Sequence, residues 1–257
     1  MISFPFALRL ALAAAALAPS AALAAAPAAP PPSVPAAAAS SHAGVRVPPS
    51  AQLIYKVEGR TRGLPVGAQA ALDWRQDGAR YTAHWTFTGP LGIRREQESS
   101  GQLTPQGLAP ERFDERNRTA HFQRGTGRIV FSNGASPAQL APGAQDRLSV
   151  SVQLGALIAA APGRFPPGAQ VTLQVAGVRG ADSWTFTVQG DETLRLAGQA
   201  MPCIKLERRA SGPSGQRITL WLARNAHYLP VRLRIAEANG DVADQQLTQL
   251  RKQGTSE

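Results

Sequence analysis

Histidine side chains are the first place to look for metal or acid–base chemistry. The chain has four, His42, His84, His121 and His227, and no two of them stand three to five residues apart. Because common zinc sites use such short spacings, the sequence predicts neither a metal site nor any other cofactor. His84 and His121 lie within alternating polar and apolar residues, which is typical of strand positions rather than ligands.

Nucleophilic and carboxylate chemistry also lacks a recognisable set of residues. The single cysteine, Cys203, lies in the alternating stretch 200–209, where we expect a small buried side chain. Lys205 would lower the pKa of its thiol if both were exposed, and that alternative stays open. Asp114 and Glu115 are adjacent, so on a strand they point to opposite faces. We therefore predict no catalytic residue, with a hydrolase whose site is dispersed along the chain as an alternative.

Basic charge is the most visible feature of the composition. The 257 residues include 27 Lys+Arg and 17 Asp+Glu, which gives a net charge of +10. A single-stranded nucleic-acid site would combine a basic groove with aromatic platforms, whereas here the aromatic residues follow the apolar phase of the pattern. We therefore expect no nucleic-acid partner. The anionic partners left are phospholipid headgroups, lipopolysaccharide or acidic proteins, and the alternative is charge that serves only solubility.

The first 50 residues contain no segment that is expected to fold. Arg9 precedes an apolar run, and Ala22-Leu23-Ala24 fits a small-x-small cleavage site, so residues 1–24 are predicted to be a signal peptide. The expected location is the periplasm of a Gram-negative bacterium, and an uncleaved anchor is the alternative. Residues 25–50 hold nine Ala and seven Pro, which predicts an extended, disordered tether.

Alternation with a period of two dominates from Ala51 onward. Turn pairs such as Asp77-Gly78, Gly190-Asp191 and Asn239-Gly240 separate the alternating stretches. We predict a mostly all-β fold, an antiparallel meander of about a dozen strands that forms a curved sheet or open barrel. One domain is expected over residues 51–250, with a flexible tail at 251–257.

One segment departs from this pattern. Residues 146–160 place Leu148, Val152 and Ile158 at helical spacing, which we interpret as one apolar face of a helix. Asp146 can cap its start, and Ala-Pro-Gly at 161–163 would end it. The helix would cover one sheet face or fill one barrel end. The β-branched content of the segment leaves a strand as the alternative.

Large aromatic residues alternate with small ones on several predicted strands. Ala68 and Ala70 stand near Trp74, and Ala83 stands beside Trp85. If these face the interior, the small residues leave room for an apolar ligand such as an acyl chain, although a packed core could show the same alternation. The residues that we expect to contact such a ligand are Trp74, Trp85, Phe87, Trp184, Arg94 and Arg95.

Several stretches resemble the proteobacterial family called "domain of unknown function 3108". They are Tyr55 to Trp74 with Gly63-Leu64-Pro65-Val66-Gly67, residues 142–147, residues 175–180, and Tyr228 to Ile235 followed by Asn239-Gly240-Asp241. The resemblance implies an exported, β-rich protein and transfers no catalytic residue. The last hairpin also looks loosely like that of outer-membrane lipoprotein carriers.

Three functions are compatible with these observations. The first, which we favour, is a non-catalytic binding module for an apolar or anionic envelope ligand, lipid or lipoprotein-like. The second is a structural or assembly factor of the cell envelope that acts on a protein partner through exposed strand edges. The third is the hydrolase with a dispersed site. The volume and lining of the fold's interior would separate them.

Overall fold

A single 15-stranded sheet makes up most of the described chain. The computed structural model describes residues 44–209 and 215–252. The predicted signal peptide, residues 25–43 of the predicted tether and residues 253–257 of the predicted tail lie outside these ranges. The prediction of a mostly all-β fold with one α-helix is confirmed.

The strands vary in length from two residues to sixteen. They are β1 (Ala51–Thr61), β2 (Leu64–Gln76), β3 (Arg80–Thr88), β4 (Arg94–Thr104), β5 (Gly107–Glu115), β6 (Arg118–Gln123), β7 (Arg128–Phe131), β8 (Ala138–Gln139), β9 (Gln145–Asp146), β10 (Gln170–Ala176), β11 (Ala181–Leu196), β12 (Gln199–Arg209), β13 (Arg217–Ala223), β14 (Leu229–Ala236) and β15 (Val242–Lys252). The helix α1 is Ser149–Ala160, and 3-10 turns occur at Pro90–Gly92, Pro162–Arg164 and Arg224–Ala226.

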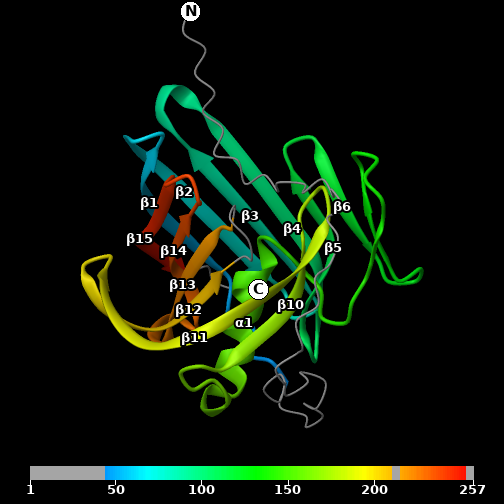
Figure 1. The fold of residues 1–257 in the computed structure, drawn as a ribbon. Helices are drawn as coiled ribbons and strands as arrows, with labels where there is room; N and C mark the ends of the chain where they lie inside the picture. The colour runs from blue at the N-terminus through cyan, green and yellow to red at the C-terminus, as the bar shows by residue number, and fades with distance from the viewer. Residues whose placement is uncertain (1–43, 210–214, 253–257) are drawn as a thin grey trace, which may run out of the picture. The chain divides into compact units, whose positions relative to one another are not determined.

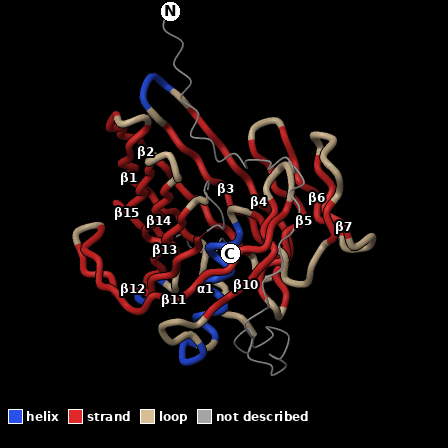
Figure 2. The backbone as a smooth tube through the Cα atoms, in the orientation of Figure 1, coloured by secondary structure: helices blue, strands red, loops and turns tan. Residues whose placement is uncertain are grey.

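The strand order joins two meanders through the first and last strands. From one end of the sheet the order is β8 to β1 in descending sequence, followed by β15 to β9. All neighbours pair antiparallel except β9 and β10, which are parallel. The sheet curves around α1, with strands of both meanders on either side of the helix (Figure 1; Figure 2 shows the same course as a tube).

One glutamine links the two ends of this open sheet. The side-chain amide of Gln174 on β10 donates to the carbonyl of Gln139 at 2.8 Å. Its Oε1 accepts from the backbone N–H of Ala141 at 2.9 Å. We call this contact between the β8 end and β10 the seam. It satisfies backbone groups that an open sheet edge would leave unpaired.

Asp146, which the sequence predicted as the cap of the helix, bonds to the first amides of α1 but lies three residues before it. Asp146 Oδ1 accepts the backbone N–H groups of Leu148 and Ser149, both at 2.8 Å, and Ser149 Oγ accepts the N–H of Asp146 at 2.9 Å. This reciprocal pair satisfies amides that a helix start leaves free. The observed helix begins at Ser149, three residues after Asp146, because Gln145 and Asp146 form β9.

The helix is apolar on more than one face, in contrast to the single apolar face predicted from the sequence. Leu148 and Val152 pack in a first apolar cluster, formed largely with β1 to β7. Val150, Leu154 and Ile158 pack in a second cluster with β10 to β14. The prediction that Ile158 shares a face with Leu148 and Val152 is therefore wrong. A helix that is apolar around its circumference belongs in an interior, and α1 lies in one.

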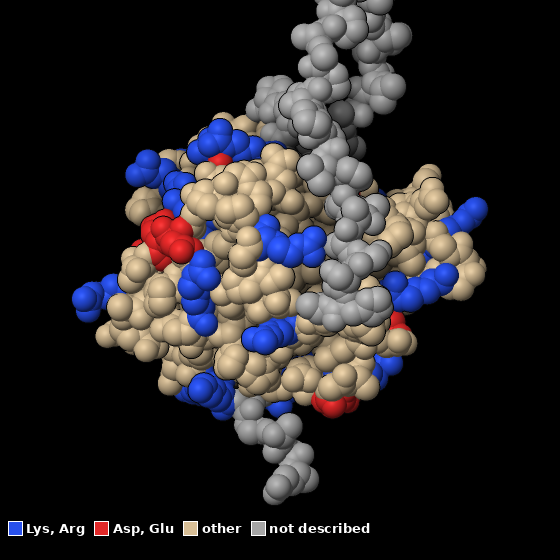
Figure 3. Space-filling model, turned by 90° about the horizontal axis from the view of Figure 1, so that it is seen from below, with Lys and Arg blue, Asp and Glu red and all other residues tan. Residues whose placement is uncertain are grey.

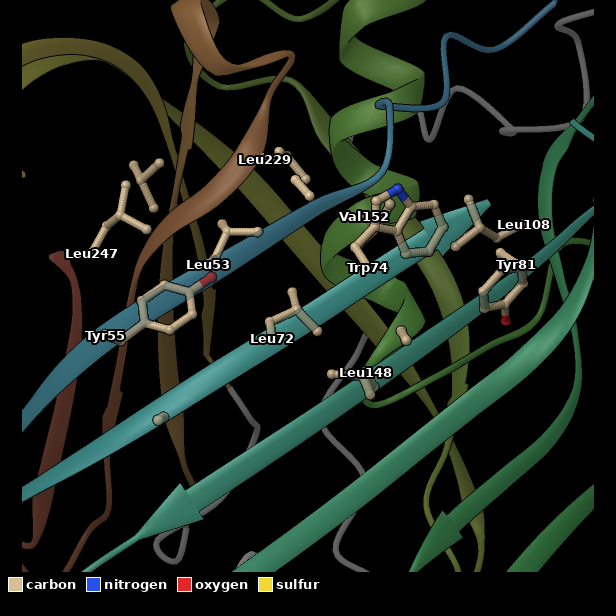
Figure 4. Close-up of a cluster of buried hydrophobic side chains, with 14 of the residues drawn as sticks. Leu53, Tyr55, Leu72, Trp74, Tyr81, Leu108, Leu148, Val152, Leu229 and Leu247 are labelled. Carbon is tan, nitrogen blue, oxygen red and sulfur yellow. The ribbon is translucent and has the colours of Figure 1, made fainter. Parts of the chain in front are cut away.

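The first cluster contains the most deeply buried aromatic residues. Trp74 is stacked on Tyr81 with ring centroids 5.4 Å apart, and its indole N–H donates to the carbonyl of Pro48 at 3.0 Å. The hydroxyl of Tyr55 donates to the carbonyl of Pro230 at 2.7 Å. Figure 4 shows these rings directed toward the side of the sheet that carries α1, among leucines from both meanders.

Two features near the chain's turns differ from simple expectation. Gly190-Asp191 was predicted to form a turn, but β11 continues through both residues. Gly190 lies at a register shift between β11 and β12. Its φ of 119°, which favours glycine, therefore belongs to a β-bulge and not to a turn. Residues 44–50 lie against the fold, since Val47 packs on the first cluster and Ser50 Oγ bonds to Gln76. The predicted tether therefore does not extend over residues 44–50, and for the residues before Gly44 it stays a prediction.

Candidate functional site

A half-exposed apolar surface lies on the same side of the sheet as the core. Strand register places side chains of five strands there, because residues paired across neighbouring strands share a face. Ala68 pairs with Val57, Val57 with Gln245, and Gln245 with Leu233. One step along the strands, Gly59 pairs with Ala243 and Ala243 with Ile235. We call the half-buried group Ala68, Trp85, Leu233, Ile235, Ala243 and Gln245 the inner-face patch.

The patch lies where the two apolar clusters meet. Ala68, Trp85 and Ala243 pack against the first cluster, whereas Leu233 and Ile235 pack against the second. Deeper on the same face the side chains are almost fully buried, as for Leu72, which pairs with Trp85. Close-packed side chains therefore fill the inner face around α1. Toward the turn between β1 and β2, the side chains of this face are only half buried.

Trp85 is the largest side chain of the inner-face patch. Its ring is stacked on Phe87 with centroids 6.0 Å apart. The indole N–H donates to Gln245 Oε1 of β15 at 3.2 Å, which ties the two meanders together across the face. An aromatic ring with a polar group beside it suits a ligand that is apolar along its length and polar at one end.

The structure separates the other residues that were expected to contact a ligand. Trp74 is fully buried, where it contacts Tyr81 and Pro48 and is not accessible to a ligand on the patch. Trp184 lies in the second cluster on β11, beneath the guanidinium carbon of Arg208 at 4.2 Å from its ring centroid. Arg95 pairs with Phe87 and so lies on the inner face, whereas Arg94 lies on the opposite face in an ion pair with Glu96. Trp85, Phe87 and Arg95 are thus brought together, and Trp74, Trp184 and Arg94 are not part of that group.

The small residues next to the aromatics do not all leave room. Ala70 is 4% exposed and Ala83 is fully buried, so both belong to a close-packed interior. Only Ala68 is half exposed, at the edge of the inner-face patch. Leu233, Ile235 and Ala243 could not be recognised from the sequence, because nothing local shows that β15 pairs with β1 and brings β14 next to it.

A buried polar network joins α1 to the sheet. Ser99 Oγ donates to Asp146 Oδ2 at 2.6 Å, and the hydroxyl of Tyr81 lies 3.0 Å from Ser99 Oγ. Burial raises the pKa of Asp146 from 3.8 to about 6, against the hydrogen bond from Ser99 and the amides of Ser149 and Leu148. Burial, followed by the charge of Asp146, raises the pKa of the Tyr81 phenol well above its usual value. The sequence identified Asp146 only as a cap.

Charged residues surround Trp221 on β13. Its indole N–H donates to Glu192 Oε2 at 3.0 Å, and Lys205 Nζ lies 3.1 Å from the same oxygen. The Lys205 Nζ and the Arg232 guanidinium carbon lie 5.3 and 4.6 Å from the ring centroid, and Arg232 is bidentate to Asp244. These cations are occupied by carboxylates and by the indole face, which favours a structural role.

Cys203 is buried, as predicted. Its thiol donates to the carbonyl of Met201 at 3.2 Å. Burial and, secondarily, the charge of Glu192 raise the thiol pKa from 9.0 to about 11. Lys205 pairs with Glu192, so the alternative in which Lys205 activates the thiol is wrong.

The described residues contain no group of three or more His, Cys, Asp or Glu side chains that could hold a metal ion. His84 pairs across the sheet with Asp73 and Glu98, and His121 pairs with Arg112. His227 is exposed in a turn with φ 52°. His42 lies outside the described residues.

Positive charge is spread over the molecule. Figure 3 shows Lys and Arg in several places on one face, with fewer Asp and Glu among them. Many arginines alternate with apolar residues along a strand and so lie on the other face of the sheet, as Arg234 does between Leu233 and Ile235. Within the described ranges no helix is long and apolar enough to cross a membrane.

The family of the chain follows from a match over most of the sheet. The model of a family described as "Protein of unknown function (DUF3108)" matches residues 53–248, from β1 into β15. The chain belongs to this family. The resemblance seen in the sequence is therefore confirmed, and the family brings no assigned activity with it. No curated protein matches the chain.

One solved structure has a similar fold, and two others match with lower scores. The DUF3108 chain is similar to a β-barrel-like protein of the domain of unknown function DUF1849 from Brucella abortus, with a TM-score of 0.56 and 12% identity over 82% of this chain and 100% of the other. A putative exported protein with a YmcC-like fold from Bacteroides fragilis matches with a TM-score of 0.39 and 12% identity, over 81% and 100% of the two chains. MucB in complex with MucA matches with a TM-score of 0.36 and 16% identity, over 84% and 54%.

Proposed function

We propose that this DUF3108 protein is a non-catalytic module of the cell envelope that binds an apolar chain on the inner-face patch. The observation that carries the proposal is the strand register, which gathers half-exposed Ala68, Leu233, Ile235 and Ala243 around Trp85 on the inner face. An apolar surface that continues a hydrophobic core is suited to an acyl chain. The predicted signal peptide supports the envelope as the location.

Arg95 supports an anionic group at one end of the ligand. It shares the inner face with Phe87, the stacking partner of Trp85. Its Nη1 donates to the carbonyl of Arg94 at 2.9 Å, and among the described residues no carboxylate pairs with it. A guanidinium beside an apolar surface matches a fatty acid or the acyl chain of an anionic lipid.

The seam weighs against the assembly-factor alternative. A partner strand would add to a free sheet edge, and Gln174 of β10 already bonds to backbone groups at the β8 end of this sheet. β8 and β9 are also only two residues long, which offers little backbone for pairing. Protein partners therefore rank below a lipid ligand.

Filling the patch tests where the ligand binds. Ala68→Trp would place an indole in the inner-face patch, whereas Ala71→Trp makes the same change on the opposite face of β2. With a fluorescent long-chain polyene fatty acid as the probe, below its micelle concentration, we expect Ala68→Trp to weaken binding at least about tenfold, equivalent to 1.4 kcal/mol. Ala71→Trp should bind like the parent protein. No binding to the parent, or equal binding by Ala68→Trp, would overturn the proposal.

A second pair of variants tests the anionic end. Arg95→Gln should weaken binding of the fatty acid but leave binding of a fatty alcohol of equal length unchanged. Arg94→Gln is the matched control, because Arg94 stands on the opposite face and pairs with Glu96. Equal effects of the two variants would show that Arg95 does not contact the carboxylate. Circular dichroism of each variant checks that the sheet is intact.

A further inference from the structure

Two neighbouring hairpin turns each expose a leucine. Leu64, at the turn between β1 and β2, is 65% exposed, and Leu91, in the turn between β3 and β4, is 92% exposed. They are the two large apolar side chains that are exposed among the described residues. Because β1 to β4 are adjacent and antiparallel, both turns lie at one end of the sheet, as Figures 1 and 2 show.

Leu91 occupies a position that is unfavourable for leucine on two grounds. Its backbone has φ 58° and ψ 27°, in the left-handed region that favours glycine or asparagine. Its side chain is almost completely exposed to solvent, so it contributes little to the core. A strained residue whose side chain packs on nothing is a candidate for contact with something outside the molecule.

The leucines stand among unpaired arginines. Arg60 and Arg62 are exposed beside Leu64, and in the described chain no carboxylate lies within ion-pair distance of either guanidinium. The nearby acidic side chains Glu96 and Asp241 have interactions with other groups. Glu96 pairs with Arg94, and Asp241, in the turn between β14 and β15, accepts the backbone N–H of Arg62 and the side-chain amide of Asn239.

We propose that these two turns dock the protein onto an anionic phospholipid bilayer. The docking edge consists of the exposed residues Arg60, Arg62, Leu64, Pro90 and Leu91. Leu64 and Leu91 would enter the apolar boundary of the leaflet, and the arginines would lie at the level of the phosphates. Exposed Lys and Arg occur on many of the described strands, so the pair of exposed leucines is what distinguishes this end of the described sheet.

The docking edge is near the inner-face patch. Ala68 follows Leu64 by four residues on β2, and Phe87 precedes Leu91 by four residues. A docked molecule would therefore hold the half-exposed part of its inner face close to the bilayer. Docking goes beyond the proposed ligand binding and does not depend on it, because a surface can bind a membrane whether or not the patch holds an acyl chain.

Vesicle sedimentation tests the docking edge. The vesicles contain equal parts of phosphatidylcholine and phosphatidylglycerol, with pure phosphatidylcholine for comparison, at about 0.15 M salt. The parent protein should bind the anionic vesicles and not the neutral ones. The double variant Leu64→Asn with Leu91→Asn should bind about tenfold more weakly, since two insertion contacts are lost. Asparagine tolerates the left-handed backbone at position 91, so folding should be preserved.

Charge variants provide the matched control. Arg60→Gln with Arg62→Gln should weaken vesicle binding about fivefold for each arginine removed. Arg128→Gln with Arg195→Gln removes the same charge from exposed positions on β7 and β11, and should bind like the parent. Failure of the parent to bind anionic vesicles, parent-like binding by the leucine variant, or an equal loss in both arginine pairs would overturn docking. Probe binding by the inner-face patch is measured without vesicles, so either proposal can fail while the other stands.

Discussion

Asp146 is a fully buried carboxyl group that serves two structures at once. One oxygen accepts the first amides of α1, and the other accepts the hydroxyl of Ser99 on β4. Burial raises its pKa to about 6, so the folded protein holds a proton on this group more tightly than the unfolded chain does. Its contribution to stability is full below about pH 4 and is lost as the pH rises through about 6.

Asp146→Asn should remove this pH dependence. The asparagine keeps an acceptor oxygen for the amides of Leu148 and Ser149 and cannot ionise. Between pH 4 and pH 7 the free energy of unfolding of the parent should fall by roughly 2 kcal/mol more than that of the variant. Urea unfolding at pH 4, 5.5 and 7 measures the difference, and parallel profiles of parent and variant would contradict the expected pKa.

Asp77→Asn is a control of opposite sign. Hydrogen bonds from the backbone N–H groups of Arg80 and Ala79 lower the pKa of this exposed carboxyl. Its contribution is therefore present above the unfolded pKa and lost as the pH falls through the folded one. The profile of this variant should depart from that of the parent in the acid range, in the opposite direction to Asp146→Asn.

At the residue scale, local roles could be predicted and distant partners could not. The cap at Asp146 follows from residues within three positions, and the burial of Cys203 follows from alternation on its own strand. Ser99 bonds to Asp146 across 47 positions, and Trp85 bonds to Gln245 across 160. Such contacts depend on which strands become neighbours, and no local pattern carries that information.

At the scale of elements, α1 depends on a close approach between its backbone and the turn before β14. A Cβ on Gly155 would lie 2.4 Å from the carbonyl oxygen of Tyr228, which is shorter than any normal contact. Glycine in a helix costs about 1 kcal/mol relative to alanine, so the residue is retained here against helix propensity. The absence of a side chain allows the helix to seat between the two apolar clusters.

Gly155→Ala should therefore destabilise the protein. The clash forces α1 or the Tyr228 turn to move. This movement should lower the free energy of unfolding by about 1–3 kcal/mol, which exceeds the gain in helix propensity. Gly163→Ala is the matched control, since a Cβ there meets no atom within 4 Å. Thermal unfolding followed by circular dichroism compares the two. An unchanged melting temperature for Gly155→Ala would mean that the helix can shift without cost.

Strand boundaries were predicted less well than strand existence, and glycine is the reason. Asp77-Gly78 and Asn239-Gly240 form turns, whereas Gly190-Asp191 lies inside the longest strand. All three glycines have positive φ, which a hairpin turn and a bulge both require. The sequence shows where the backbone needs glycine but not which of the two structures uses it.

For the whole molecule, the decisive contact is between the first and last strands. β1 pairs with β15 from Ala51 and Lys252 to Arg60 and Val242, which joins the two meanders into one sheet. This pairing also assembles the inner-face patch, since it brings Leu233 and Ala243 beside Ala68 and Trp85. The meander could be predicted from hairpin spacing, but the patch could not, because it needs this pairing between opposite ends of the chain.

The strand order predicts which circular permutation the fold tolerates. A chain opened between Pro142 and Gly143, with Lys252 joined to Gly44 by a Gly/Ser linker of about 15 residues, would run from β9 to β15 and on from β1 to β8. Every antiparallel pair is kept, so melting should stay within about 5 °C of the parent. Opening the chain at Gly78 instead cuts the hairpin between β2 and β3 beneath Trp74 and Tyr81, and should cost more. If both permutants melted alike, the seam would be as important to the fold as its central hairpins.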